Sequence, residues 1–269
     1  MRTDRATAAT ITLLAAVFAV YFLLPFIGLI DRALDDGRTW DLAHSEQTRK
    51  ALWLSIWTST LTVALAIAFG TPVAYLLSRA RFPGKPVVDA LIDLPIVLPP
   101  TVAGVALLTA FGRRGLLGKP IEEWTGETFA FTTVAVIMAQ LLVATPFYVR
   151  AARSGFDSVD RRLESVAYTL GASRTKTFFR IVLPQMRPAI LAGIVLCWAR
   201  SMGELGATLI FAGNFEGKTQ TMPLAIIQAF ETSSVGLAGA IALSLVLLAI
   251  ATVLLVLFRV VTSRGAFQA

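Results

Sequence analysis

One arginine and one glutamate lie deep inside a long apolar segment of the sequence. Arg200 and Glu204 fall within residues 189–211 and form the only ionisable pair well inside a predicted membrane span. At a spacing of four, both would lie on one helix face, where their charges can neutralise each other. A lone charge at the bilayer centre costs roughly 2.5–3.5 kcal/mol on insertion scales, so the pair must face protein or water. Two interpretations remain open: a polar lining at the gate of an anion pathway, and an ion pair that ties this span to its neighbours.

Prolines give a second apolar segment, residues 91–111, an unusual start. Pro95, Pro99 and Pro100 lie in its first half, where each frees a backbone carbonyl and bends the helix. Irregular backbone in lipid needs a protein partner or a cavity. We predict either a bent helix that lines a pathway around Pro99, Pro100 and Thr101, or a kink that only improves packing.

The heptapeptide from Gly213 to Thr219 ends in Gly-Lys-Thr, as a phosphate-binding loop does. Only three residues separate Gly213 from Gly217, where the motif needs four, and no strand precedes them. We interpret the segment as a tight turn. Energy for any transport must then come from another chain or from an ion gradient.

The residues that usually build catalytic and metal sites are sparse. His44, the single histidine, lies in a polar loop without neighbouring ligands, and Cys197, the single cysteine, lies in an apolar run. The sequence offers no paired nucleophile and base. We therefore predict no catalytic residue, no metal site and no cofactor.

Composition indicates a membrane protein that crosses the bilayer several times. Of 269 residues, 56% are hydrophobic and 15% are charged, far from the averages of soluble domains. The net charge of +7 is not clustered with aromatic side chains, which argues against nucleic acid as a partner. We predict an all-α fold, one transmembrane domain over residues 1–269 in contact with membrane lipid, with six spans at about 11–30, 51–77, 91–111, 129–149, 189–211 and 237–258.

The distribution of basic residues predicts the orientation of these spans. With both termini inside, the cytoplasmic segments carry nearly twice as many Lys and Arg residues as the external ones. The first apolar run lacks a nearby cleavage site of small residues, so we interpret it as a retained span and not a signal peptide. Both termini and the segment 157–184 are therefore predicted to be cytoplasmic.

Segment 157–184 is the only long charged stretch that interrupts the apolar sequence from within. Leu163, Val166, Ala167 and Leu170 recur at helical spacing, and Gly171 ends the run. Ser173 can cap a second helix that ends before Pro184, which gives two helices at 163–170 and 173–183. Both are too short to span a bilayer, yet each has an apolar face that another surface must cover.

This segment resembles the cytoplasmic signature of permease subunits of ABC importers, which reads Glu-Ala-Ala, three residues, Gly, nine residues, Ile, one residue, Leu-Pro. Gly171, Ile181, Leu183 and Pro184 match it, whereas Ser165, Val166 and Ala167 occupy the Glu-Ala-Ala positions and Glu164 stands one residue early. The resemblance implies a type I ABC importer permease fold and a pair of coupling helices that docks on a separate ATPase. The residues it assigns to that contact are Glu164, Ser165, Val166, Ala167, Gly171, Ala172, Ser173, Ile181, Leu183 and Pro184. The alternative is an ordinary amphipathic cytoplasmic loop.

Segments 98–104, 111–115, 146–150, 199–208, 211–214 and 219–225 resemble the molybdate or tungstate branch of these permeases. The resemblance implies a homodimer in a bacterial or archaeal inner membrane. It also implies two partners, a cytoplasmic ATPase dimer and an extracytoplasmic oxyanion-binding protein. A sulfate or thiosulfate permease is the alternative within the family. Outside it, the alternatives are a proton-coupled secondary transporter that uses Glu204 as carrier, and a membrane-embedded enzyme.

Overall fold

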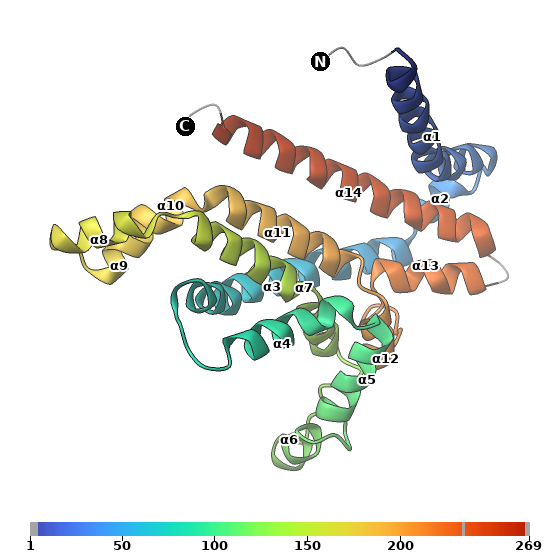
Figure 1. The fold of residues 1–269 in the computed structure, drawn as a ribbon. Coiled ribbons are helices and arrows are strands. Elements are labelled where there is room, and N and C mark those ends of the chain that lie inside the picture. The colour runs from blue at the N-terminus through green and yellow to red at the C-terminus, as the bar shows by residue number, and fades with distance from the viewer. Residues whose placement is uncertain (1–4, 233–234, 267–269) are drawn as a thin grey trace.

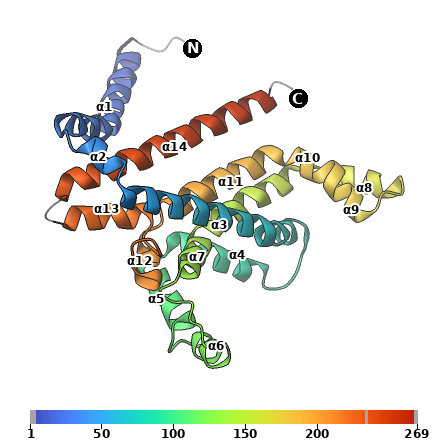
Figure 2. The same cartoon turned by 180° about the vertical axis from the view of Figure 1, so that it is seen from behind.

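The computed structural model describes residues 5–232 and 235–266, and every regular element in these two ranges is a helix. Three of them, α3 (Glu46–Arg79), α7 (Thr133–Ser158) and α11 (Arg187–Met202), lie side by side and form the centre of the molecule (Figures 1 and 2). The all-α prediction is confirmed. At least one of these three contacts each of five further helices, which are α4 (Lys85–Val97), α5 (Pro100–Phe111), α12 (Gly206–Ala212), α13 (Met222–Glu231) and α14 (Gly236–Ala266).

Glycines allow the three central helices to approach closely. A Cβ on Gly70 of α3 would lie 3.0 Å from a Val149 methyl group, and one on Gly193 of α11 would lie 3.0 Å from the Cβ of Ala151. A Cβ on Gly155 would come within 2.7 Å of the Cβ of Ala189. Small residues bring helix backbones together in membrane proteins, where the hydrophobic effect gives little drive for helix association.

A buried glutamine joins the same three helices by hydrogen bonds. The Gln140 amide of α7 donates to Thr58 Oγ1 (3.2 Å), Ser59 Oγ (3.4 Å) and the Ser201 carbonyl (3.2 Å), and its oxygen accepts from Thr62 Oγ1 (3.0 Å). Gln140 is 1% exposed. Buried polar groups need such partners, because each unpaired one costs its full desolvation penalty.

Six spans are predicted from the sequence, and the described part of the chain has between four and six helical segments of membrane-spanning length. Within residues 5–232 and 235–266, four helices are long and apolar enough to cross a membrane: α1 (Arg5–Asp35), α3, α7 and α14 (Gly236–Ala266). Two bent pairs bring the number to six if each counts as one span. These are α4 (Lys85–Val97) with α5 (Pro100–Phe111), at 115°, and residues Arg174–Gln185 with α11, at 72°.

Shorter helices complete the structure around this bundle. They are α2 (Thr39–Ala43), α6 (Gly118–Thr125), α12 (Gly206–Ala212) and α13 (Met222–Glu231), with α8, α9, η1 and α10 between α7 and α11. The α13 helix packs against α3 and α14, and its first residue, Met222, donates its N–H to Ser55 Oγ at 2.7 Å. The α1 helix projects away from the bundle beside α14 (Figure 1), and its apolar side chains are exposed in the single chain.

The buried glutamine gives a direct test of this packing. We expect Gln140→Ala to lower the free energy of unfolding by about 1–3 kcal/mol, because several buried hydroxyl groups and the Ser201 carbonyl lose a partner. Gln185→Ala is the matched control, since Gln185 is exposed and bonds only its own helix at the Ile181 carbonyl. Thermal unfolding in detergent measures both variants. Equal midpoints for the two would contradict the role given to Gln140.

Candidate functional site

The fifth predicted span is broken at the position of its charged pair. The α11 helix ends at Met202 and α12 begins at Gly206. Glu204 therefore lies in the connection, and the prediction that Arg200 and Glu204 share one continuous helix face is wrong. Gly203 is the C-cap of α11, and the Glu204 side chain, rather than a preceding turn, satisfies the Ala207 N–H at the start of α12.

The charged pair nevertheless forms. Arg200 Nη1 lies 3.0 Å from Glu204 Oε2, with side chains that are 28% and 1% exposed. The other carboxylate oxygen, Oε1, accepts the backbone N–H of Ala207 at 2.8 Å. A carboxylate at the start of a helix satisfies a free N–H and interacts favourably with the helix dipole. Glu204 thus joins the two halves of the span, whereas Arg200 reaches toward a more open region.

The carbonyl at the end of α11 is satisfied twice. Ser201 O accepts the backbone N–H of Glu204 (3.1 Å) and the Gln140 amide (3.2 Å). The central helices therefore hold the break in place through Gln140.

The second break lies directly against the first. Leu98 and Pro99 separate α4 from α5, and Pro100 is the first residue of α5. Two successive prolines suit this position because neither has an N–H that the start of a helix would leave unpaired. A Cβ on Gly206 would lie 2.9 Å from Pro100 Cβ, and one on Gly104 would lie 2.9 Å from Ala207 Cα. Pro99, Pro100 and Thr101 are exposed at this junction.

The structure thus brings together the five pathway residues predicted from two distant segments. Pro99, Pro100 and Thr101 adjoin the start of α12. Glu204 caps this helix, and Arg200 neutralises the charge of Glu204. This junction of the two breaks, residues 98–101 and 203–206, is hereafter the broken-span junction.

Segment 157–184, for which a coupling role is predicted and which is hereafter called the coupling segment, has a helix, a glycine turn and a second helix. The α8 helix spans Arg161–Thr169 and α9 spans Arg174–Thr177. Gly171 has φ 80°, and the N–H groups of Gly171 and Ala172 return to the carbonyls of Tyr168 (3.0 Å) and Ala167 (2.9 Å). These two bonds form a Schellman motif, which requires the left-handed backbone that glycine adopts at little cost.

The second half of the segment departs from the prediction at Pro184. Ser173 caps α9 by accepting the N–H of Lys176 (3.3 Å), but the chain then continues through η1 (Phe178–Val182), a π-helical turn, into α10 (Leu183–Gln185). Pro184 lies inside this last turn instead of after it. The wide π-helical turn bonds five residues back, which relieves the clash that proline makes with the carbonyl four residues before it.

The remaining residues of the coupling segment divide into two groups. Ser165 and Val166 are exposed, as are Leu163 and Leu170, so of the four-residue face predicted for the first helix only Ala167 is buried. Ala172, Ile181, Leu183 and Pro184 are half-buried. The segment lies beyond the ends of α7 and α11 in both views (Figures 1 and 2).

Glu164 points inward. Its Oε1 lies 2.6 Å from Arg79 Nη2 at the end of α3, and the two side chains are 11% and 13% exposed. In this structure the glutamate anchors α8 to the bundle and is not part of the exposed face.

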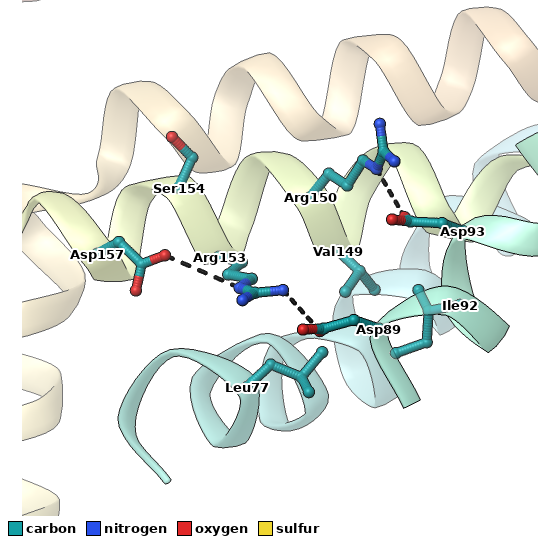
Figure 3. Close-up of a pocket in the computed structure, with 9 residues that line it drawn as sticks. All are labelled: Leu77, Asp89, Ile92, Asp93, Val149, Arg150, Arg153, Ser154 and Asp157. Atoms are coloured by element: carbon teal, nitrogen blue, oxygen red, sulfur yellow. Dashed lines mark hydrogen bonds and ion pairs between the residues drawn. The ribbon is translucent and has the colours of Figure 1, made fainter. Parts of the chain in front are cut away.

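Sequence analysis missed a set of charged residues between α4 and α7. Arg150 Nε lies 2.6 Å from Asp93 Oδ1, and Arg153 Nη1 lies 2.6 Å from Asp89 Oδ1 (Figure 3). These side chains line a cavity of about 300 Å³. The spacing of four between Asp89 and Asp93 and of three between Arg150 and Arg153, each on one helix face, was the available signal.

Known transport proteins resemble this chain over most of its length. Residues 66–265 match the family model described as binding-protein-dependent transport system inner membrane component. The molybdenum transport system permease protein ModB of Escherichia coli K12 is 42% identical over 77% of this chain and 90% of its own. A probable molybdenum ABC transporter permease of Haloferax volcanii is 38% identical over 91% of this chain and 87% of its own length.

Solved structures show the same fold at low sequence identity. A bacterial ABC transporter involved in import of the acidic polysaccharide alginate matches with a TM-score of 0.76, at 16% identity, over 96% of this chain and 95% of that one. The MetNI methionine ABC transporter, in inward-facing conformations, matches with a TM-score of 0.62 over 82% of this chain and 98% of that one. The chain therefore belongs to the binding-protein-dependent transport system inner membrane component family, the permease subunits of ABC transporters.

Proposed function

We propose that this chain forms the membrane pathway of an ATP-driven importer of molybdate or tungstate. The observation that carries the proposal is 42% identity to a molybdenum transport permease over 90% of that protein's length. A relative from Chlorokybus atmophyticus described as a probable sulfate transport permease is 36% identical over 78% of this chain, so sulfate is the second candidate.

We further propose that the coupling segment docks on a cytoplasmic ATPase. Its outer face carries Leu163, Val166, Leu170 and Phe179, which are 42%, 56%, 81% and 59% exposed. Such a face needs a protein cover, because these side chains lie on two short helices beyond the ends of the spans. The ion pair of Arg79 and Glu164 attaches α8 to the end of α3, so displacement of the outer face would be transmitted to the bundle.

The broken-span junction is our candidate for the gate of the pathway. Two copies of the chain would enclose one route for the anion, fed by an extracytoplasmic binding protein. Irregular backbone at membrane depth occurs where it lines a cavity or is buried in protein, and here Pro99, Pro100 and Thr101 are exposed in the single chain. Glu204 suits the role of a proton carrier poorly, because both of its carboxylate oxygens have a partner.

Uptake assays test the function. In vesicles that contain this permease with the ATPase and binding protein that co-purify with it, we expect ATP-dependent uptake of molybdate. Sulfate in roughly tenfold excess should compete poorly, which requires that molybdate is bound about a hundredfold more tightly, a difference of about 2.8 kcal/mol. Preferred uptake of sulfate would assign the chain to the sulfate importers, and uptake driven by a proton gradient without the ATPase would refute the ABC mechanism.

The coupling segment is tested at Gly171. Valine resists the left-handed backbone angles that the Schellman motif needs, so Gly171→Val should change the angle between α8 and α9. We expect the variant to insert normally but to lose co-purification with the ATPase. Gly217→Val is the matched control, because Gly217 has φ 74° and, like Gly171, has no atom within 4 Å of an added Cβ. Wild-type ATPase association in Gly171→Val would show that the segment is an ordinary loop.

The junction is tested by separating the two functions of Glu204. Glu204→Ala removes the cap of α12, worth about 1 kcal/mol, and leaves Arg200 without a counter-charge in the span. Adding Arg200→Ala should restore part of the transport and thermal stability, and Glu204→Gln with Arg200→Ala should restore more, because glutamine can still accept the Ala207 N–H. Equal losses in all three variants would contradict this assignment.

A further inference from the structure

The α4 helix is attached to the rest of the molecule in an unusual way. None of its residues, Lys85–Val97, is buried, although the helix is mostly apolar. Val87, Leu91 and Val97 are 62%, 61% and 82% exposed. Val88 and Ile92 pack partly buried against the core of α3, α7 and α11, so the apolar attachment of α4 is limited and other interactions must add to it.

Two ion pairs add to that attachment. Asp89 and Asp93, one turn apart on α4, face Arg153 and Arg150 of α7, with both contacts at 2.6 Å (Figure 3). All four side chains are between 26% and 58% exposed, so water can reach the pairs. Ion pairs in such positions are weak and can exchange partners for water, unlike a packed apolar core.

Cavities lie between α4 and the bundle. The charged cavity of about 300 Å³ holds the ion pairs. A second cavity of about 460 Å³ is apolar and separates α4 and α5 from α3 and α7, with Phe69, Leu91, Pro95 and Met138 among its lining residues. The unfilled volume beside the contacts between α4 and α7 leaves room for α4 to shift.

One end of α4 is suited to act as a hinge, whereas the other is a fixed bend. Gly84 precedes the helix with φ 85°, and an added Cβ there would meet no atom within 4 Å. The other end is the break at Leu98 and Pro99, where the chain turns by 115° into α5 and the proline rings fix φ. Hinges are a few residues at element ends that absorb backbone rotation, as Gly84 can, so rotation there would carry the bend at Pro99 along with α4.

The ion pairs also connect to the coupling segment. Arg153 lies 3.8 Å from Asp157, which accepts a hydrogen bond from Ser78 Oγ. The carbonyl of Ser78 accepts from Arg161 at the start of α8 (2.8 Å), and the neighbouring Arg79 pairs with Glu164. A continuous series of polar contacts therefore runs from α8 to α4.

We propose that Asp89 and Asp93 form a releasable latch, hereafter the α4 latch, that holds α4 on α7 in the present state and opens in another state of the transport cycle. Movement of the coupling segment is transmitted to the latch through Arg153. Release of α4 then displaces residues 99–101 at the broken-span junction. The latch rests on the proposed function, because it needs an ATP-driven cycle to open it. Asp89 and Asp93 act as positioning residues and do not need to touch the anion.

Neutralising the latch tests this proposal. Asp89→Asn with Asp93→Asn should leave insertion and ATPase association intact but raise the number of ATP molecules hydrolysed per molybdate imported, because the gate no longer follows the coupling segment. A purely structural defect would lower hydrolysis and uptake together and leave this ratio unchanged. The matched control is Glu122→Gln, which removes the exposed ion pair of Glu122 with Arg113 (3.2 Å) outside the proposed route.

A charge exchange provides the second arm. Asp93→Arg alone places two arginines face to face and should raise the same ratio, whereas Asp93→Arg with Arg150→Asp re-forms the pair in reverse and should return it to the wild-type value. An unchanged ratio in the neutral and charge-reversed variants would overturn the latch. Absence of ATP-driven molybdate uptake in the wild-type protein would instead overturn the proposed function.

Discussion

A lipid bilayer provides no water to satisfy a broken helix, so every freed backbone group must find a partner inside the protein. Two interrupted spans make this constraint decisive here. At one break, Glu204 accepts the Ala207 N–H and the Ser201 carbonyl takes donors from Glu204 and Gln140. At the other, Pro99 and Pro100 have no N–H to satisfy. Because each break needs protein around it, the two lie against each other.

The central helices follow from the same requirement. Gln140 reaches the break because glycines let α3, α7 and α11 approach closely. Hydroxyl groups of Thr58, Ser59 and Thr62 form the other hydrogen bonds of its side-chain amide. The α4 helix contrasts with this arrangement, since it has a charged attachment and adjacent cavities. The structure thus combines a closely packed bundle with one helix that has no fully buried residue and leads directly into the broken-span junction.

Local features of the chain could be predicted from sequence, whereas contacts between distant segments could not. The left-handed Gly171 and the cap at Ser173 were predictable, because each depends on a few neighbouring residues. The inward turn of Glu164 depends on Arg79, and the pairs of Asp89 and Asp93 depend on α7, so spacing alone gave no partner for them. Glu204 was placed on the wrong element, because apolar residues continue past Gly203 and conceal the end of α11.

Cysteine accessibility tests most directly whether the broken-span junction lines a pathway. In a Cys197→Ala background, Thr101→Cys can be exposed to a charged, membrane-impermeant thiol reagent in vesicles that hold the assembled importer. We expect the rate of labelling to differ between the nucleotide-free and ATP-trapped states, molybdate to slow it during turnover, and the modification to block uptake. Labelling that is independent of state and leaves molybdate uptake at the unmodified rate would contradict the account.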